Sequence, residues 1–127
     1  GLSISDEFLI IASPMKTLSR SIFTKDLKLL TDIIYKFNVG GLIIGLPLNL
    51  NGQEGPRCQS TRQFAKNILN HLDIPITFWD ERFSTAVINK MLIAEVDMSR
   101  QKRKKVIDKM AATYILQGAL DSLSLKK

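Results

Sequence analysis

Two adjacent carboxylates at the end of an apolar segment are the residues of this sequence best suited to chemistry. Residues 74–85 read Ile-Pro-Ile-Thr-Phe-Trp-Asp-Glu-Arg-Phe-Ser-Thr. The apolar first half predicts a buried strand, and the final Ser-Thr pair can cap a following helix. Asp80 and Glu81 therefore leave the strand where open α/β sheets place their sites. Side chains alternate along a strand, so only one acid leads into a site on a given face. The alternative is that both acids are structural, pairing with Arg82 or capping the helix.

A third acid, Asp108, lies within a helix predicted over residues 102–123. Its helical neighbours at spacings of three and four are Lys104, Lys105, Ala111 and Ala112. Small residues let a helix approach a sheet closely, so Asp108 could face the acid that leaves the strand. Converging carboxylates bind Mg²⁺ or Mn²⁺ through hard oxygen ligands, and such ions activate water and polarise phosphates. The alternative is that Asp108 only pairs with its neighbouring lysines.

Positive charge is concentrated in one part of the chain, residues 99–109, which we call the basic segment. The whole chain carries a net charge of +6. The basic segment holds six basic residues against one acid, and so +5 of that total. A localised positive patch suits a polyanion such as nucleic acid or an anionic surface. The alternative is a solvated loop tip.

Composition limits the class of protein. A chain of 127 residues, 45% hydrophobic and 24% charged, is typical of a single globular domain, here residues 1–127. No apolar run approaches the roughly 20 residues of a membrane span, and no signal-peptide pattern is visible. The single cysteine, Cys58, excludes an internal disulfide and a cysteine-based metal site, which indicates a reducing, cytoplasmic setting.

The elements that must position these acids follow from hydrophobic periodicity and turn residues. Strands are predicted over 1–6, 8–18, 42–46 and from 74, and helices over 25–37, 56–72, 86–95 and 102–123. Thr24 is the expected cap of the first helix, and Pro14 suits an edge strand. A polar loop with an Asn51-Gly52 turn is expected over 47–55. This order predicts an α/β fold, a mixed sheet with helices packed on it.

Apolar stripes predict which helix faces are buried. The first helix is expected to bury Leu27, Leu30, Ile34 and Phe37. The second is expected to bury Phe64, Ile68 and Leu72. The last is expected to bury Ile107, Met110, Tyr114 and Leu120. A linker is expected over 96–101 before the last helix. The lone His71, near the end of the second helix, is expected to favour the helix dipole rather than bind metal.

Four ordered blocks give a resemblance that covers essentially the whole chain. They are Gly-Leu-Pro-Leu-Asn at 45–49, Gly52 with Glu-Gly-Pro-Arg at 54–57, Trp-Asp-Glu-Arg at 79–82 with Ser-Thr at 84–85, and Arg-Lys-Lys-Val-Ile-Asp-Lys at 103–109 with Ala-Ala at 111–112. On these blocks the chain resembles the YqgF (RuvX) family. That resemblance implies an RNase H-like fold, with a mixed central sheet flanked by helices, related to Holliday-junction resolvases. It also implies a cytoplasmic nuclease that matures the 5′ end of 16S ribosomal RNA.

The resemblance implies roles for individual residues. Glu81 and Asp108 occupy the positions of the family's metal-binding acids, with Mg²⁺ or Mn²⁺ as the expected ion. The residues expected to contact phosphates are Arg57, Arg82, Arg103, Lys104 and Lys105. The loop over 47–55 is expected on the substrate side.

The chain departs from the family pattern at its start. Family members open with a strand that carries Gly-x-Asp-x-Gly-x-Lys-Arg-x-Gly, and its aspartate is the first metal ligand. Gly1 resembles the last glycine of that block, so the first acid is missing from this sequence. We expect the native protein to carry a further strand before Gly1, about ten to twenty residues long with its turn.

Three alternatives to a pre-16S RNA nuclease follow from the same residues. One is a nucleic-acid-binding or ribosome-assembly factor in which the basic segment binds and the acids are structural. Another is a Holliday-junction resolvase acting on branched DNA, an activity that generally requires a symmetric dimer. Nucleotide hydrolysis is disfavoured, because one domain of this length lacks a second lobe to close over a nucleotide. The expectation is a monomer or weak homodimer that binds RNA and no membrane.

Overall fold

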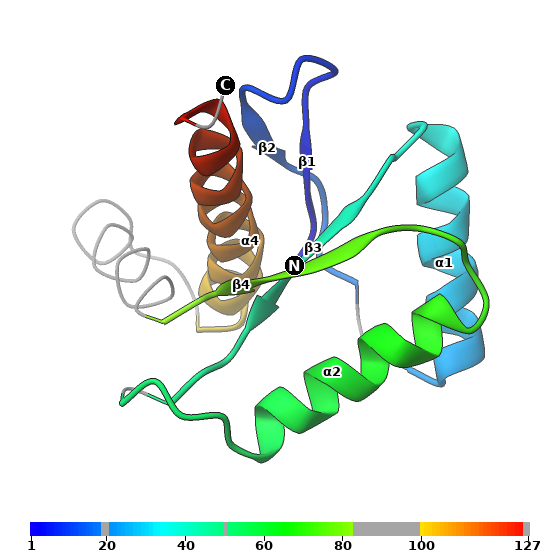
Figure 1. Cartoon of the computed structure of the whole chain (residues 1–127). Helices are drawn as coiled ribbons and strands as arrows, with labels where there is room; N and C mark the ends of the chain where they lie inside the picture. Colours follow the sequence, from blue (N-terminus) through cyan, green and yellow to red (C-terminus); the bar gives the residue numbers. More distant parts are fainter. Residues whose placement is uncertain (19–20, 50, 83–99, 126–127) are drawn as a thin grey trace. The chain divides into compact units, whose positions relative to one another are not determined.

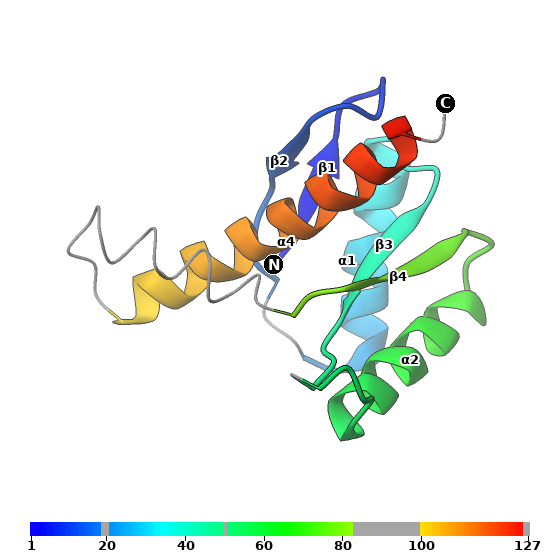
Figure 2. The same ribbon diagram turned by 60° about the vertical axis from the view of Figure 1, so that its left-hand side comes forward.

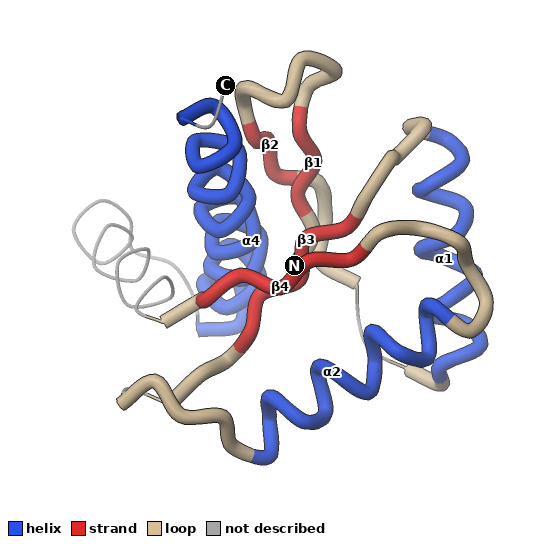
Figure 3. The backbone as a smooth tube through the Cα atoms, viewed as in Figure 1, coloured by secondary structure: helices blue, strands red, loops and turns tan. Residues whose placement is uncertain are grey.

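A computed structural model gives the arrangement of the chain and describes residues 1–18, 21–49, 51–82 and 100–125. Its elements, labelled as in Figure 1, are β1 (Ser3–Ser5), β2 (Ala12–Pro14), α1 (Phe23–Lys36), β3 (Leu42–Leu46), α2 (Pro56–Leu69), β4 (Ile76–Asp80) and α4 (Arg100–Leu125). Strands and helices are mixed along the chain, as predicted (Figure 3). The helix expected over 86–95, with its capping residues Ser84 and Thr85, lies outside the described residues. No helix in the described part is long and apolar enough to cross a bilayer.

The chain divides into two compact units, Gly1–Thr17 with Asp80–Lys127, and Leu18–Trp79. In the first, β1 and β2 pair antiparallel, with Ser3 opposite Pro14 and Ser5 opposite Ala12. The second contains a two-stranded sheet of β3 and β4.

The strand expected over 8–18 is wrong at both ends, because residues 8–11 form an exposed loop and β2 ends at Pro14. The Asp6 carboxylate causes the difference at the start. One of its oxygens accepts the backbone N–H groups of Ile10 and Ile11, at 2.7 and 2.9 Å. These hydrogen bonds, from Ile11 and then Ile10, lower the pKa of Asp6. A side chain that bonds nearby backbone groups offers them an alternative to the strand ladder, so β2 begins only at Ala12.

Helix α4 packs along the β1–β2 hairpin in both ribbon views (Figures 1 and 2). The Ser3 hydroxyl donates to the carbonyl of Ala112 at 3.0 Å. The Gln117 amide accepts from the backbone N–H of Ala12 and donates to the carbonyl of Ile10, both at 2.8 Å. The small residue at 112 thus lies where the helix meets β1, in line with the expectation that small side chains permit close approach.

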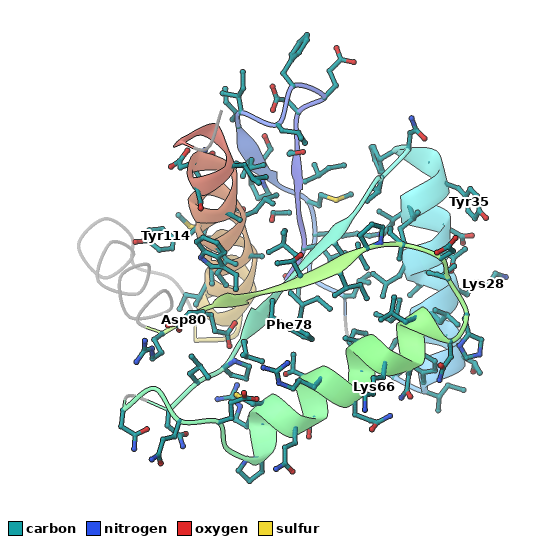
Figure 4. The ribbon with its side chains drawn as sticks, viewed as in Figure 1. Lys28, Tyr35, Lys66, Phe78, Asp80 and Tyr114 are labelled. Carbon is teal, nitrogen blue, oxygen red and sulfur yellow. The ribbon has the colours of Figure 1, made fainter. Side chains whose placement is uncertain are left out.

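The predicted apolar stripe of α4 is correct at Leu120, which is buried, but wrong at Tyr114, which is 53% exposed. Tyr114 points away from the hairpin (Figure 4). The buried positions include Ile115 and Ala119, which lie three and seven residues after Ala112 and continue its face. Helix α4 also starts at Arg100, so the linker expected over 96–101 is wrong at its last two residues.

In the second unit, the chain runs from β3 through α2 to β4, and both arrows point to the same side (Figure 1). The backbone N–H of Leu42 donates to the carbonyl of Pro75 at 2.9 Å, beside the start of the pair. Helix α2 begins with Pro56 in its first turn, as predicted. It buries Ile68, which is 1% exposed, and Cys58, which is fully buried as a free thiol. Phe23 of α1 meets Phe64 of α2 edge to face, with ring centroids 6.0 Å apart.

The expectation that Thr24 caps α1 is wrong. The helix starts at Phe23, two residues earlier than predicted, and the capping position is Ile22, which makes no side-chain cap. The buried Asp26 carboxylate accepts the backbone N–H of Ser21 instead, at 3.2 and 3.3 Å. At the other end, Asn38 has φ 52° and stops the helix as predicted, while Phe37 is 46% exposed and not buried as expected.

Candidate nucleic-acid and metal site

The end of β4 places Asp80 and Arg82 in direct contact. One Asp80 oxygen accepts the backbone N–H of Arg82 at 2.9 Å. The other accepts from the Arg82 guanidinium through Nε at 2.8 Å and Nη2 at 2.7 Å. The hydrogen bonds from Arg82 lower the pKa of Asp80, and Asp80 raises the pKa of the Arg82 guanidinium. Of the two alternatives considered for this acid, structural pairing with Arg82 is therefore the one observed.

Glu81 directly follows Asp80, the last residue of β4. It is half-buried, whereas Asp80 is exposed at the end of β4 (Figure 4). The two acids thus stand in different environments although they are neighbours in sequence.

The remaining predicted acid, Asp108, lies in α4, as does the basic segment from Arg100 onward. The helix is continuous from 100 to 125, so Lys104 and Lys105 stand four and three residues before Asp108 on neighbouring turns. Their side chains, and that of Arg103, lie outside the described residues. The meeting of Asp108 with Glu81 therefore stays a prediction.

A metal ion suits the chemistry of the predicted acids. Among the side chains that the structure describes, no group of three or more His, Cys, Asp or Glu could hold a metal ion. Both oxygens of Asp80 accept hydrogen bonds from Arg82. The predicted carboxylate ligands of a metal ion are therefore Glu81 and Asp108. Mg²⁺ is commonly held by one or two carboxylates, with water and substrate phosphates completing its octahedron. A two-carboxylate set of hard oxygen donors fits that requirement. His71 makes a different contact, with ring Nδ1 2.9 Å from the carbonyl oxygen of Asn67 in the last turn of α2.

The loop after β3 is held in a compact turn. The backbone N–H of Gly52 donates to the carbonyl of Asn49 at 2.8 Å, and that of Asn49 donates to the carbonyl of Gln53 at 2.9 Å. Gly52 has φ 86°, a left-handed conformation that favours glycine, so the turn predicted at Asn51-Gly52 is confirmed. The Cys58 thiol also approaches the carbonyl of Pro47 at 3.3 Å, which ties the loop's start to α2.

Arg62, which no sequence pattern singled out, links the end of this loop to β4. Its guanidinium donates to both Glu54 oxygens, at 2.6 and 3.0 Å. It also lies 4.9 Å from the centre of the Phe78 ring, which Figure 4 shows between β4 and α2. The hydrogen bond from Arg62 lowers the pKa of Glu54. The only sequence signal for this contact was Glu54, in the Glu-Gly-Pro-Arg block. Arg62 lies outside that block, and its ring partner, Phe78, comes from a separate strand. Arg57, the predicted phosphate contact of this block, is exposed in the first turn of α2.

Comparison with known proteins shows which family the chain belongs to. A family model described as "RuvX: Holliday junction resolvase" matches residues 1–122. A protein of Roseobacter denitrificans is 52% identical over 125 residues, which cover 97% of this chain and 76% of that protein. A protein of Rhodospirillum rubrum is 46% identical over 127 residues, covering 100% of this chain and 79% of that protein. A Zymomonas mobilis protein is 52% identical over 125 residues, covering 98% and 76%. All three carry the name "Putative pre-16S rRNA nuclease".

Proposed function

Because this chain belongs to the RuvX family, we propose that it is a divalent-metal-dependent nuclease that matures the 5′ end of 16S ribosomal RNA. The observation that carries the proposal is the match to relatives with that name, about half identical over almost the whole chain. We place the activity in the cytoplasm, in a monomer or weak homodimer, with pre-16S RNA as the substrate.

In this proposal Glu81 and Asp108 hold Mg²⁺ or Mn²⁺. When bound, such an ion activates a water and stabilises the leaving oxygen of the phosphodiester. The phosphate contacts are assigned to Arg57, Arg82, Arg103, Lys104 and Lys105. Arg57 is exposed at the N-terminus of α2, where a helix favours anions. The loop over 47–55, which Arg62 ties to β4, is assigned to the substrate side.

The proposal includes an RNase H-like fold in one domain. The mixture of strands and helices in the described residues and the match to the RuvX family support it. The chain spans 76% of the length of the Roseobacter protein and 79% of the Rhodospirillum protein.

Removal of the metal tests the main assignment. We expect the protein to cleave a single-stranded RNA with a pre-16S 5′ extension when Mn²⁺ or Mg²⁺ is present. Chelation with EDTA should abolish cleavage, and excess metal should restore it, because the water is activated by the ion. Gel analysis of end-labelled RNA measures this. Cutting that persists in EDTA would show that the carboxylates have another role.

A second candidate, resolution of branched DNA, is favoured by the description of the matching family model. Resolution requires paired cuts, which symmetric dimers supply. A four-way DNA junction in the same assay separates the two substrates. Symmetric nicks with a dimer in solution would favour the junction, whereas a monomer that cuts RNA and leaves junctions intact would favour RNA.

The basic segment offers a third test, which addresses binding. Replacing Lys104 and Lys105 with alanine should lower the slope of log affinity against log salt by about 0.7 for each lost single-strand phosphate contact. The matched control replaces Lys25 and Lys28, two exposed lysines of α1, and should leave the slope unchanged. Fluorescence anisotropy with labelled RNA measures both. Equal slopes in the two double variants would place the basic segment away from the RNA. Binding without any cleavage would favour a non-catalytic assembly factor.

A further inference from the structure

The Asp-Glu-Arg sequence at the end of β4 contains one carboxylate whose role the proposed function leaves open. Asp80 makes three contacts with Arg82, between 2.7 and 2.9 Å, and they use both carboxylate oxygens. One oxygen fixes the backbone of Arg82, and the other fixes its guanidinium. A single side chain therefore sets both the path of the chain out of β4 and the direction of the arginine.

Stability alone does not account for this arrangement. The Asp80 and Arg82 side chains are 41% and 31% exposed. Ion pairs at that exposure contribute little to folding, because water screens them and ordering two side chains costs entropy. A pair with good geometry and little effect on stability is better explained by the position that it imposes on one partner.

The same contacts argue against Asp80 as a metal ligand. A metal ion at this carboxylate would compete with the Arg82 guanidinium for the same oxygens and would release the backbone turn. Asp80 is therefore assigned to the arginine and Glu81 to the metal.

We propose that Asp80 is a positioning residue, which holds the Arg82 guanidinium in place to bind a phosphate of the RNA beside the metal-binding Glu81. This inference rests on the proposed nuclease function. Its physical basis is that a guanidinium presents a rigid planar set of donors that matches phosphate. An arginine already ordered by a neighbouring acid loses less conformational freedom when the phosphate arrives.

A double-mutant cycle on RNA binding tests the proposal. Binding is measured in EDTA with a 5′-labelled single-stranded RNA, so that neither metal nor cleavage contributes. Asp80→Ala and Arg82→Ala should each weaken binding about tenfold, the scale of one charge-assisted hydrogen bond. The double variant should bind no worse than either single variant, because both changes remove the same interaction. Asp80→Asn keeps an oxygen for the backbone turn but loses the charge, and it should lie between wild type and Asp80→Ala.

Two other roles predict different results. If Asp80 only repels RNA by its charge, Asp80→Ala should tighten binding, and that outcome overturns the proposal. If Asp80 is a metal ligand, binding in EDTA should stay unchanged while the metal concentration for half-maximal cleavage rises, which also overturns it. If Asp80 positions Arg82, Asp80→Ala should instead raise the KM for RNA and leave kcat and the metal requirement unchanged.

A matched control and a separate readout keep the two proposals distinguishable. Asp73→Ala removes an exposed acid in the turn after α2 and should leave binding unchanged. If wild-type protein binds RNA but does not cut it with either metal, the nuclease assignment fails, and the cycle in EDTA still tests the role of Asp80.

Discussion

Glu81→Gln is expected to abolish metal-dependent RNA cleavage while leaving the fold intact. Glutamine has nearly the volume of glutamate but offers only a neutral amide oxygen, which binds a hard divalent ion more weakly than a carboxylate does. Loss of a metal ligand is expected to lower kcat by roughly a thousandfold, which corresponds to several kcal/mol of transition-state stabilisation. Single-turnover cleavage with saturating protein measures the loss free of any change in RNA affinity.

Two controls make this result specific. Asp73→Asn is the same type of change at an exposed acid outside the site, and it should cut RNA at the wild-type rate. Thermal unfolding of Glu81→Gln should match wild type, because glutamine keeps nearly the volume of glutamate. Undiminished cleavage by Glu81→Gln would remove this residue from the metal site. Loss of folding in the variant would instead assign Glu81 a structural role.

Ile68→Ala should have the largest effect on stability. Ile68 is 1% exposed in α2 and is one of the largest fully buried side chains among the described residues. Its replacement removes three buried carbon atoms and leaves a cavity that close-packed neighbours fill only in part. The expected loss is about 2–5 kcal/mol of unfolding free energy, a large share of the total for a small domain. Urea unfolding followed by circular dichroism measures it.

Leu69 provides a control on the same helix. It follows Ile68 directly and is 50% exposed, so Leu69→Ala removes a similar side chain without leaving a buried cavity. Its cost should stay within about 1 kcal/mol, typical of surface substitutions. Equal losses at the two positions would show that α2 does not bury the face assigned to it. The comparison therefore tests the helix orientation as well as the size of the effect.

Local sequence patterns predicted much of the fold because the responsible interactions act between near neighbours. The wholly apolar segment became β3 with the predicted bounds, Leu42–Leu46. Pro56 opened α2, Asn38 closed α1, and Gly52 supplied the left-handed turn. Each of these last three outcomes depends on the backbone preferences of a single residue type. The family was equally accessible from sequence, because four ordered blocks specify it without any coordinates.

The wrongly predicted strand and helix starts also have local causes, which the spacing of apolar residues does not reveal. The Asp6 carboxylate accepts hydrogen bonds from nearby backbone N–H groups, so β2 begins later than predicted. The Asp26 carboxylate does the same at the start of α1, where Thr24 was expected as the cap. A hydrogen bond of this kind competes directly with secondary structure, and a pattern of apolar residues says nothing about it. At Tyr114 the buried face of α4 was misjudged, because the surface that it meets is a hairpin distant in sequence.

By itself the sequence determined the family and the order of the described elements, because these depend on residue type and spacing, and it supplied the acids of the proposed site as predictions. It left open whether Asp80 belongs to a metal site or to a structural pair. Only the tertiary structure decided that Asp80 holds Arg82, and that Arg62 joins Glu54 to the Phe78 ring. The physical reason is that a contact depends on the direction in which each side chain points. The spacing of residues limits which side chains can meet, but the turn after a strand and the packing of a helix on that strand determine which of them do.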